Sequence, residues 1–424
     1  MLLQAAFTAF LDLVGFSIIF PLFPKMLDHY LVLEGPDSAL GALIAQLRAF
    51  AGSGESSRFM VNALFGGVLG SFYSIAQFLF SPVWGSLSDR IGRRPTLLLT
   101  LTGTAVAHLG WMFAGSFGVL VGARLLGGVM AGNVSTVTAV AADVSEKEHR
   151  ARAMGVIGAS IGLGFIIGPA IGGISFAFNP VELWPHLAAY GINPFSGAAF
   201  VSSMLALVNL GVVAVAFPET LPKAKRDATS ERTANPLALF SGAIPGAARV
   251  NLIYLVFQTA FSAMEFSLVF LTVERFDYAP MDNAMMFVFV GFIGALVQGG
   301  LMRRLATRFR ETRLAITGMA CVLLGMVGVA FASGGPSLYG ALFLLAVGSA
   351  LVMPSLSGLA SRYAPESQQG RTLGLFRSAG ALSRAIGPVL GGTIYWQLGS
   401  ASPTLAGAIV ILVPITLAFK LPEP

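Results

Sequence analysis

Runs of about twenty apolar residues recur along the whole chain, and this pattern most constrains what the chain can fold into. A helix needs about 20 mainly apolar residues to cross a bilayer. We expect spans near 4–24, 60–83, 95–114, 117–141, 152–175, 195–217, 250–273, 282–302, 313–333, 336–360, 371–395 and 403–420. Only 11% of the 424 residues are charged, against roughly 25% in soluble domains. The sequence therefore predicts an all-α membrane protein with twelve transmembrane helices.

A charged, proline-bearing stretch at 218–236 separates the sixth span from the seventh and is typical of a linker. We expect an N-terminal six-helix bundle over 1–217, a cytoplasmic linker over 218–249 and a C-terminal six-helix bundle over 250–424. The start, MLLQAAFTAF, lacks the basic n-region of a signal peptide, so we expect a retained first span.

The distribution of basic residues predicts the orientation of the spans. With a cytoplasmic N-terminus, inward-facing segments hold 19 of the 26 Lys and Arg residues, outward loops hold four, and three lie inside helices. Cytoplasmic loops carry such an excess, which predicts that both termini are cytoplasmic. We expect a multi-pass protein of a cell membrane, the bacterial inner membrane. Because the net positive charge comes from these loops, we expect no nucleic-acid partner.

Two segments in the predicted halves repeat each other. Residues 152–173 align without a gap to 371–392, at a constant offset of 219, and the identical positions include Arg152, Gly155, Gly168, Pro169, Gly172 and Gly173. The fifth span therefore matches the eleventh, and the halves are predicted to be pseudo-symmetric parallel repeats. Such repeats are typical of transporters, whose substrate site lies near the midplane of the membrane.

The loop GSLSDRIGRRP (85–95) places one acid among several arginines at a cytoplasmic helix end. Charge pairs there can hold one conformation and release it in another, although the arginines could also serve only to fix topology. At the offset of 219 the second half has Arg308 in place of Asp89, so we expect a one-sided latch or a different one there. The candidate latch residues are Gly85, Asp89, Arg90, Gly92, Arg93 and Arg94.

This loop resembles the signature loop of the major facilitator superfamily, G-x-L-x-D-R-x-G-R-R. The segment LVGARLLGGVMAG (120–132) resembles the fourth-helix motif of that family, whose arginine would be Arg124. LDLVGFSIIFPLFP (11–24) is similar to the first helix of the twelve-span drug:proton antiporters. The resemblance implies alternating access, and its nearest branch is the tetracycline-resistance efflux proteins with tetracycline transporter-like organic-anion carriers.

The fifth span resembles the Gly-Pro motif that marks the antiporter branches of this family, and the eleventh span repeats it. The resemblance implies a helix-packing role for Gly164, Gly168, Pro169, Gly172, Gly387 and Pro388.

Only two acids lie well inside the predicted helices, Asp12 in the first span and Glu265 in the seventh. Burial favours the neutral form of a carboxyl group, and a nearby arginine favours the charged form. A movable Asp12–Arg124 or Glu265–Arg384 pair could therefore load and release a proton. Alternatively, each acid is only a static partner for an arginine.

Two arginines lie inside the eleventh span, where the matching helix has Gly158 and Phe165. At 1.5 Å per residue, Arg377 lies roughly 9 Å from the helix entry and could snorkel, whereas Arg384 lies about 20 Å in. Arg384, together with Arg377, could attract an anionic or zwitterionic substrate group. Arg384 could instead neutralise Glu265 or cap exposed carbonyls.

Other polar residues at membrane depth are candidates for the wall of a substrate cavity, although buried amides commonly just bond across helices. The candidates are Gln77, Asn133 and Gln258. The long outward loop 28–59 contains an apolar period at 39–50 that predicts a short surface helix.

The sequence lacks the motifs of an ATP-driven pump, of an enzyme and of a metal site. No lysine follows a glycine, so no phosphate loop is present, and no nucleophile–base or metal-ligand pattern stands out. We expect a monomeric carrier and no enzyme, cofactor or metal, with a small-molecule substrate, protons and the lipid bilayer as partners. The expected activity is proton-coupled multidrug efflux of small amphipathic compounds. The alternatives are a facilitative or proton-symport carrier of small organic anions, and a lipid or lysolipid flippase.

Overall fold

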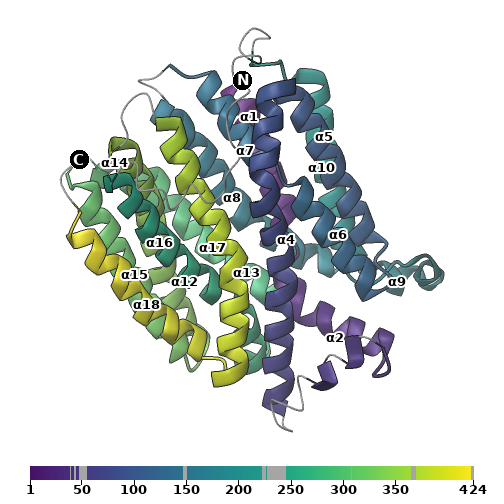
Figure 1. Cartoon of the computed structure of the whole chain (residues 1–424). Helices are drawn as coiled ribbons and strands as arrows, with labels where there is room; N and C mark the ends of the chain where they lie inside the picture. Colours follow the sequence, from purple (N-terminus) through teal and green to yellow (C-terminus); the bar gives the residue numbers. More distant parts are fainter. Residues whose placement is uncertain are drawn as a thin grey trace. The chain divides into compact units, whose positions relative to one another are not determined.

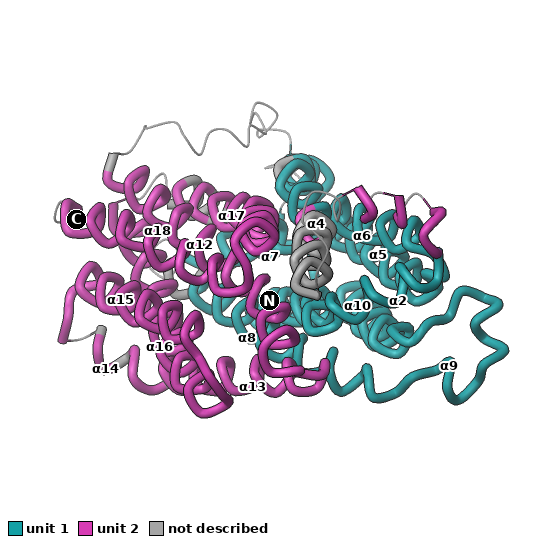
Figure 2. The backbone as a smooth tube through the Cα atoms, turned by 90° about the horizontal axis from the view of Figure 1, so that it is seen from below, with its two compact units in different colours: residues 1–34, 72–236 teal, residues 35–71, 237–424 magenta. Residues whose placement is uncertain are grey.

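The computed structural model describes residues 1–38, 40–42, 44–46, 55–146, 150–221, 226, 245–306, 308–363 and 369–421. Helices joined by short turns make up most of this part of the chain, as the apolar runs predict (Figure 1). Two compact units are present: unit 1 comprises Met1–Glu34 and Phe72–Pro236, and unit 2 comprises Gly35–Ser71 and Leu237–Pro424 (Figure 2). Of the predicted linker, 222–225 and 227–244 lie outside the described residues.

The N-terminal helices overlap the six spans predicted for the first half. They are α1 (Leu2–Ser17), η1 (Phe20–Leu22), α2 (Phe23–Glu34), α4 (Glu55–Ile91), α5 (Arg93–Met112), α6 (Phe117–Met130), α7 (Asn133–Asp143), α8 (Arg150–Phe176), α9 (Pro180–Leu183), η3 (Pro185–Tyr190) and α10 (Ser196–Ala216). Within unit 1, α1 packs against α7, α8 and α10, and α5 packs against α6, α7 and α10. The polar residues of α1 therefore face other helices of the unit.

The C-terminal helices follow the same plan. They are α12 (Pro245–Phe276), α13 (Pro280–Leu296), the π-helical turn η6 (Val297–Leu301), α14 (Met302–Ala306), α15 (Glu311–Ala330), α16 (Gly335–Tyr363), α17 (Gln369–Leu398) and α18 (Ser402–Phe419). Within unit 2, α12 packs against α16, α17 and α18, and α15 packs against α16 and α18. The contacts α1–α8 and α12–α17 join the same pair of spans in each half, the first with the fifth and the seventh with the eleventh.

Two spans that the sequence predicts as continuous are broken. The first leaves regular α-helix after Ser17, passes through η1 and continues as α2 to Glu34, so 28–34 is helix and not loop. Pro21 and Pro24 lie in this stretch and cannot donate backbone hydrogen bonds. The predicted 117–141 span is split at 131–132 into α6 and α7. Broken helices are tolerated at membrane depth where protein surrounds them.

The composition of the helices fits a lipid environment. Eight described helical segments are long and apolar enough to cross a membrane: Leu2–Glu34, Phe117–Asp143, Gly155–Leu183, Ser196–Ala216, Gly246–Phe276, Glu311–Ala330, Gly335–Tyr363 and Ser402–Phe419. α13 is apolar but shorter, and α4, α5 and α17 are not among the eight. Large apolar side chains such as Leu3, Val215 and Ile409 are exposed on the helix surfaces, as lipid-facing residues would be. The count of twelve spans stays a prediction, and the predicted surface helix at 39–50 lies partly outside the described residues.

Candidate functional site

The turn between α4 and α5 has a backbone conformation that suits only glycine. Gly92 has φ of +111°, and a Cβ added to it would collide with the carboxylate of Glu219. A positive φ is unfavourable for residues that carry a Cβ. Gly92 thereby reverses the chain so that α5 begins at Arg93, beside the last turn of α4.

Arg93 is the centre of the predicted latch. Its side chain is almost fully buried, and Nη1 donates to Asp89 and to the hydroxyl of Ser88, each at 2.6 Å. Nε donates to Asp143, at the end of α7, at 2.8 Å. Two carboxylates therefore neutralise this arginine through charge-assisted hydrogen bonds, the strong kind. Arg93 ties α4, α5 and α7 together at one end of unit 1.

Glu219, which follows α10, completes this cluster. Its carboxylate accepts from the backbone N–H groups of Arg93 at 3.0 Å and Arg94 at 3.3 Å, and it pairs with Arg226 at 3.3 Å. The first N–H groups of a helix have no partner within the helix, and an acid is favourable there. Arg94 donates to the carbonyl of Ala214 at 2.6 Å, whereas the predicted latch residue Arg90 is exposed.

The C-terminal half builds the corresponding contact with its charges exchanged. Arg362, at the end of α16, donates to Glu311, at the start of α15, at 2.7 Å. Arg362 lies 219 residues after Asp143, so the acid at this helix end in unit 1 is a base in unit 2. The second half therefore also has a charge pair between these two helix ends, with the signs of the charges exchanged. Its side chains are much more exposed, 53% for Arg362, so the pair is expected to be weaker.

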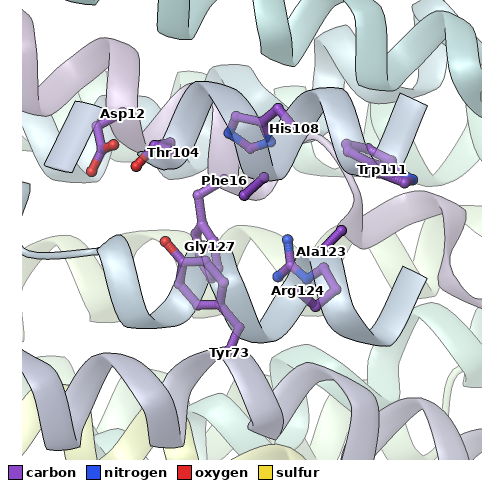
Figure 3. Close-up of a pocket in the computed structure, with 10 residues that line it drawn as sticks. Asp12, Phe16, Tyr73, Thr104, His108, Trp111, Ala123, Arg124 and Gly127 are labelled. Carbon is purple, nitrogen blue, oxygen red and sulfur yellow. The ribbon is translucent and has the colours of Figure 1, made fainter. Parts of the chain in front are cut away.

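A small cavity lies among α1, α4, α5 and α6, at the depth of the first-span break. Its walls are formed by Asp12, Phe16, Tyr73, Thr104, Ala107, His108, Trp111, Ala123, Arg124 and Gly127. Its volume is about 10 Å³, close to what one water molecule needs. Asp12 and Arg124 lie at opposite ends of it (Figure 3).

Asp12 is held by an amide and not by an arginine. The Nδ2 of Asn133 donates to Asp12 Oδ1 at 2.8 Å and lies 3.5 Å from the hydroxyl of Thr104. The hydroxyl of Thr100 lies 2.5 Å from Asn133 Oδ1. Because Thr100 and Thr104 are one turn apart on α5, they orient the fully buried Asn133 amide towards α1.

The break between α6 and α7 brings Asn133 into this position. The indole of Trp84 donates to the carbonyl of Val129 at 2.5 Å, near the end of α6. Gly132 lies directly against the Trp84 ring, where a Cβ would come within 2.5 Å of Trp84 Cβ. The absence of a side chain at Gly132 allows this approach, and α7 starts anew at Asn133.

Arg124 is buried with 4% exposure and has no carboxylate partner among the described residues. Its guanidinium carbon lies 4.6 Å from the ring centre of Tyr73 and 5.4 Å from that of Phe16. Cation–π contacts contribute about 2 kcal/mol when desolvated, and a central bilayer charge costs at least about 2.5–3.5 kcal/mol. The two rings thus offset part of the cost of burying the charge. Their faces do not replace the oxygen acceptors that the N–H groups of a guanidinium usually bind. The expected Asp12–Arg124 pair is not formed in this structure, since Asn133 and the two rings take its place.

Comparisons with known proteins identify the family of this chain. A family model described as Major Facilitator Superfamily matches residues 5–388 and 301–424. The chain belongs to the major facilitator superfamily. It is 31% identical to major facilitator superfamily domain-containing protein 10 of Mus musculus, over 98% of this chain and 91% of that one. It is 28% identical to the class B tetracycline resistance protein of Escherichia coli, over 91% and 86% respectively. The crystal structure of the human organic anion transporter MFSD10 (TETRAN) has a TM-score of 0.76 and 29% identity, covering 98% of both chains.

The protein is thus a multi-pass membrane transporter, and the comparisons confirm the fold class that the motifs imply. In unit 2 of this transporter, the partly buried Glu265 on α12 lies within electrostatic reach of Arg384 on α17. The predicted role of this pair in proton transfer stays a prediction. The side chain of Arg377 lies outside the described part of the chain.

The glycines of the two Gly-Pro helices lie close to the first helix of their own half. On α8, a Cβ at Gly164 would meet Leu13, one at Gly168 would meet Ser17, and one at Gly172 would meet the Ile18 carbonyl of the first span. On α17, a Cβ at Gly387 would lie 2.7 Å from Ser262 of α12. Pro169 and Pro388 lie buried inside these helices. Both halves of the transporter therefore use the same close glycine contact.

Sequence reasoning overlooked several residues of the two clusters. Asp143 and Glu219 are acids at helix ends on the predicted cytoplasmic side, and counting acids there as well as arginines would have found them. Tyr73, Thr100, Thr104 and Trp84 carry no sequence signal beyond being polar at membrane depth. Gln77 and Gln258 are half buried and do not line the cavity of unit 1, so their role stays a prediction.

Proposed function

We propose that this transporter is a secondary active carrier that works by alternating access and exchanges protons for small amphipathic organic compounds, anionic or zwitterionic ones included. Asp12 is the observation that carries the proposal. It is an acid at membrane depth, held by the neutral amide of Asn133 and separated by a small cavity from the cation of Arg124. Protonation of Asp12 removes the negative charge of that cavity without breaking an ion pair.

The arginines inside the predicted spans support the proposal that the substrate carries a negative charge. Inside the predicted spans, Arg124, Arg377 and Arg384 outnumber the acids Asp12 and Glu265 by one. In this proposal Glu265 is a second proton carrier, and Arg384, assisted by Arg377, attracts the acidic group of the substrate. Gln77, Asn133 and Gln258 supply neutral hydrogen bonds. Relatives described as a tetracycline resistance protein and an organic anion transporter fit this substrate class.

A carrier of small organic anions that takes them up with protons, or without them, is the second candidate. The similarity to a human organic anion transporter favours it. It uses the same residues, and only the sign of proton movement distinguishes it from the antiporter. When substrate is added outside the vesicles, antiport moves protons out as substrate enters and acidifies the external medium. Symport carries protons in with the substrate and makes the external medium more alkaline.

The test is transport in proteoliposomes across a set pH gradient, with a panel of cationic, neutral and anionic compounds. We expect substrate flux to follow the gradient in the wild type. In Asp12→Asn the gradient response should fall at least about tenfold, the effect of removing a working acid–base group. Asp277→Asn is the control, because Asp277 lies in a turn outside the helices and has a positive φ that asparagine accepts. Flux that ignores the gradient in the wild type, or is equal in Asp12→Asn, contradicts proton coupling.

A further inference from the structure

The Arg124 guanidinium has more N–H donors than its surroundings have acceptors. Nε and Nη2 are buried and have no hydrogen-bond partner among the described residues. The rings of Tyr73 and Phe16 are cation–π partners of the guanidinium, and they leave these two donors unsatisfied. Buried polar groups without partners are rare in folded proteins, and each one points to a strained site or to a bound species.

Among the described residues, no wall of the cavity, His108 and Tyr73 included, accepts a hydrogen bond from Nε or Nη2 of Arg124. Asp12, the one carboxylate among the lining residues, lies at the opposite end and accepts from Asn133 (Figure 3). The hydroxyl of Thr104 is also within reach of Asn133. Trp111, another lining residue, has a buried indole N–H that is itself without a hydrogen-bond partner in the described part of the chain. The cavity therefore holds the positive charge of Arg124 and buried N–H groups that no described residue satisfies.

We propose that this cavity binds one small monovalent anion, chloride under cellular conditions, against Nε and Nη2 of Arg124. An anion accepts both hydrogen bonds and also balances the buried charge, whereas a water molecule could satisfy only the hydrogen bonds. The volume of about 10 Å³ is at the lower limit for one water molecule, so a chloride ion requires the lining side chains to move slightly outward, and an organic carboxylate is far too large. The site is thus distinct from the proposed substrate site at Arg384. It stands on the contacts of unit 1 alone, whether or not transport is coupled to protons.

Chloride binding to the purified full-length protein tests this proposal. The ³⁵Cl NMR line width would be measured in detergent micelles at constant pH and ionic strength, with gluconate as the replacement anion. The wild type should broaden the line saturably, and bromide should displace the chloride. In Arg124→Gln the specific broadening should fall at least about tenfold. Arg362→Gln should retain it, because that arginine is exposed and lies on α16 of unit 2.

A second measurement covers the case in which Arg124→Gln does not fold. Wild-type crystals soaked in bromide should show an anomalous peak in the cavity beside Arg124. Absence of that peak, or a wild type that binds no chloride saturably, overturns the proposal. Equal chloride binding by a folded Arg124→Gln also overturns it. If acetate displaces the chloride as well as bromide does, the site accepts carboxylates and the assignment to a halide is wrong.

Discussion

Gly92 shows how one residue positions a whole cluster of charges. Its positive φ lets α4 end and α5 begin within one residue, and its missing side chain leaves room for the Glu219 carboxylate. That carboxylate then binds the first N–H groups of α5, and Arg93 enters between Asp89 and Asp143. The glycine of the loop motif is thus explained by backbone geometry together with electrostatics.

We expect Gly92→Ala to destabilise the protein by at least about 1–2 kcal/mol, because an L-residue is strained in a left-handed conformation and the methyl group would displace Glu219. Thermal unfolding in detergent would measure the loss. Gly85→Ala is the matched control. Gly85 lies within α4 in open space, where alanine is favoured over glycine in a helix. Equal stability of the two variants would contradict this account of Gly92.

At the scale of helices, each half is organised by a glycine-rich helix packed on the first helix of the repeat. The glycines of α8 lie against α1 and the residues that follow it, and those of α17 lie against α12. Small residues allow such close approach between membrane helices, which associate through packing and not through the hydrophobic effect. The repeat that the sequence shows at an offset of 219 is therefore a repeat of one packing contact.

Two glycines of α8 provide a test of this contact. In Gly172→Ala the new methyl group would collide with the Ile18 carbonyl, and overpacking of this kind costs about 1–3 kcal/mol. Gly162→Ala, on the same helix, meets open space and should be neutral or slightly stabilising. Unfolding in detergent would compare the two variants. The contact is unimportant if both leave the stability unchanged.

The charge pair of unit 1 contains a buried arginine and that of unit 2 an exposed one, so we expect that removing the acid destabilises the protein to different extents in the two halves. Asp143→Asn removes one partner of the buried Arg93 and should cost about 1–3 kcal/mol, the value for a buried charge-assisted hydrogen bond. Glu311→Gln removes the partner of the exposed Arg362 and should cost at most about 1 kcal/mol. Unfolding midpoints at low and high salt would measure both, with a larger salt response expected for the exposed pair. A Glu311 variant that is the less stable of the two would contradict this ranking.

For the whole molecule, the distribution of basic residues predicts which loops share a side of the membrane. Cys321 is the single cysteine, so Cys321→Ser provides a background for new cysteines. A membrane-impermeant maleimide should label Ala189→Cys and Ser333→Cys from outside intact cells, and Glu146→Cys and Arg308→Cys only after lysis. All four positions are exposed. Labelling of Glu146→Cys in intact cells would reverse the predicted topology.

Much of the fold was accessible from the sequence because a bilayer imposes local requirements. Each span must be long and apolar, loops on one side are basic, and a repeated motif implies a repeated helix. The positions of the helices, the likeness of the fifth and eleventh spans and the arginine loop follow from these requirements. The break after Met130 did not, because it depends on Trp84 and Gly132 meeting from different helices.

Partner choice was decided only by the tertiary structure. The sequence places Asp12 and Arg124 as charges within the membrane-spanning helices of the first half, and it predicts that they pair with each other. The packing of α5 and α7 around α1 instead placed the Asn133 amide on Asp12, and two aromatic rings on Arg124. Likewise, Asp143 and Glu219 became partners of Arg93 because helix ends far apart in the chain meet at one place. The charge of a segment and the length of an apolar run can be read from the linear sequence. A hydrogen bond depends instead on which side chains the packed helices bring within about 3 Å of each other.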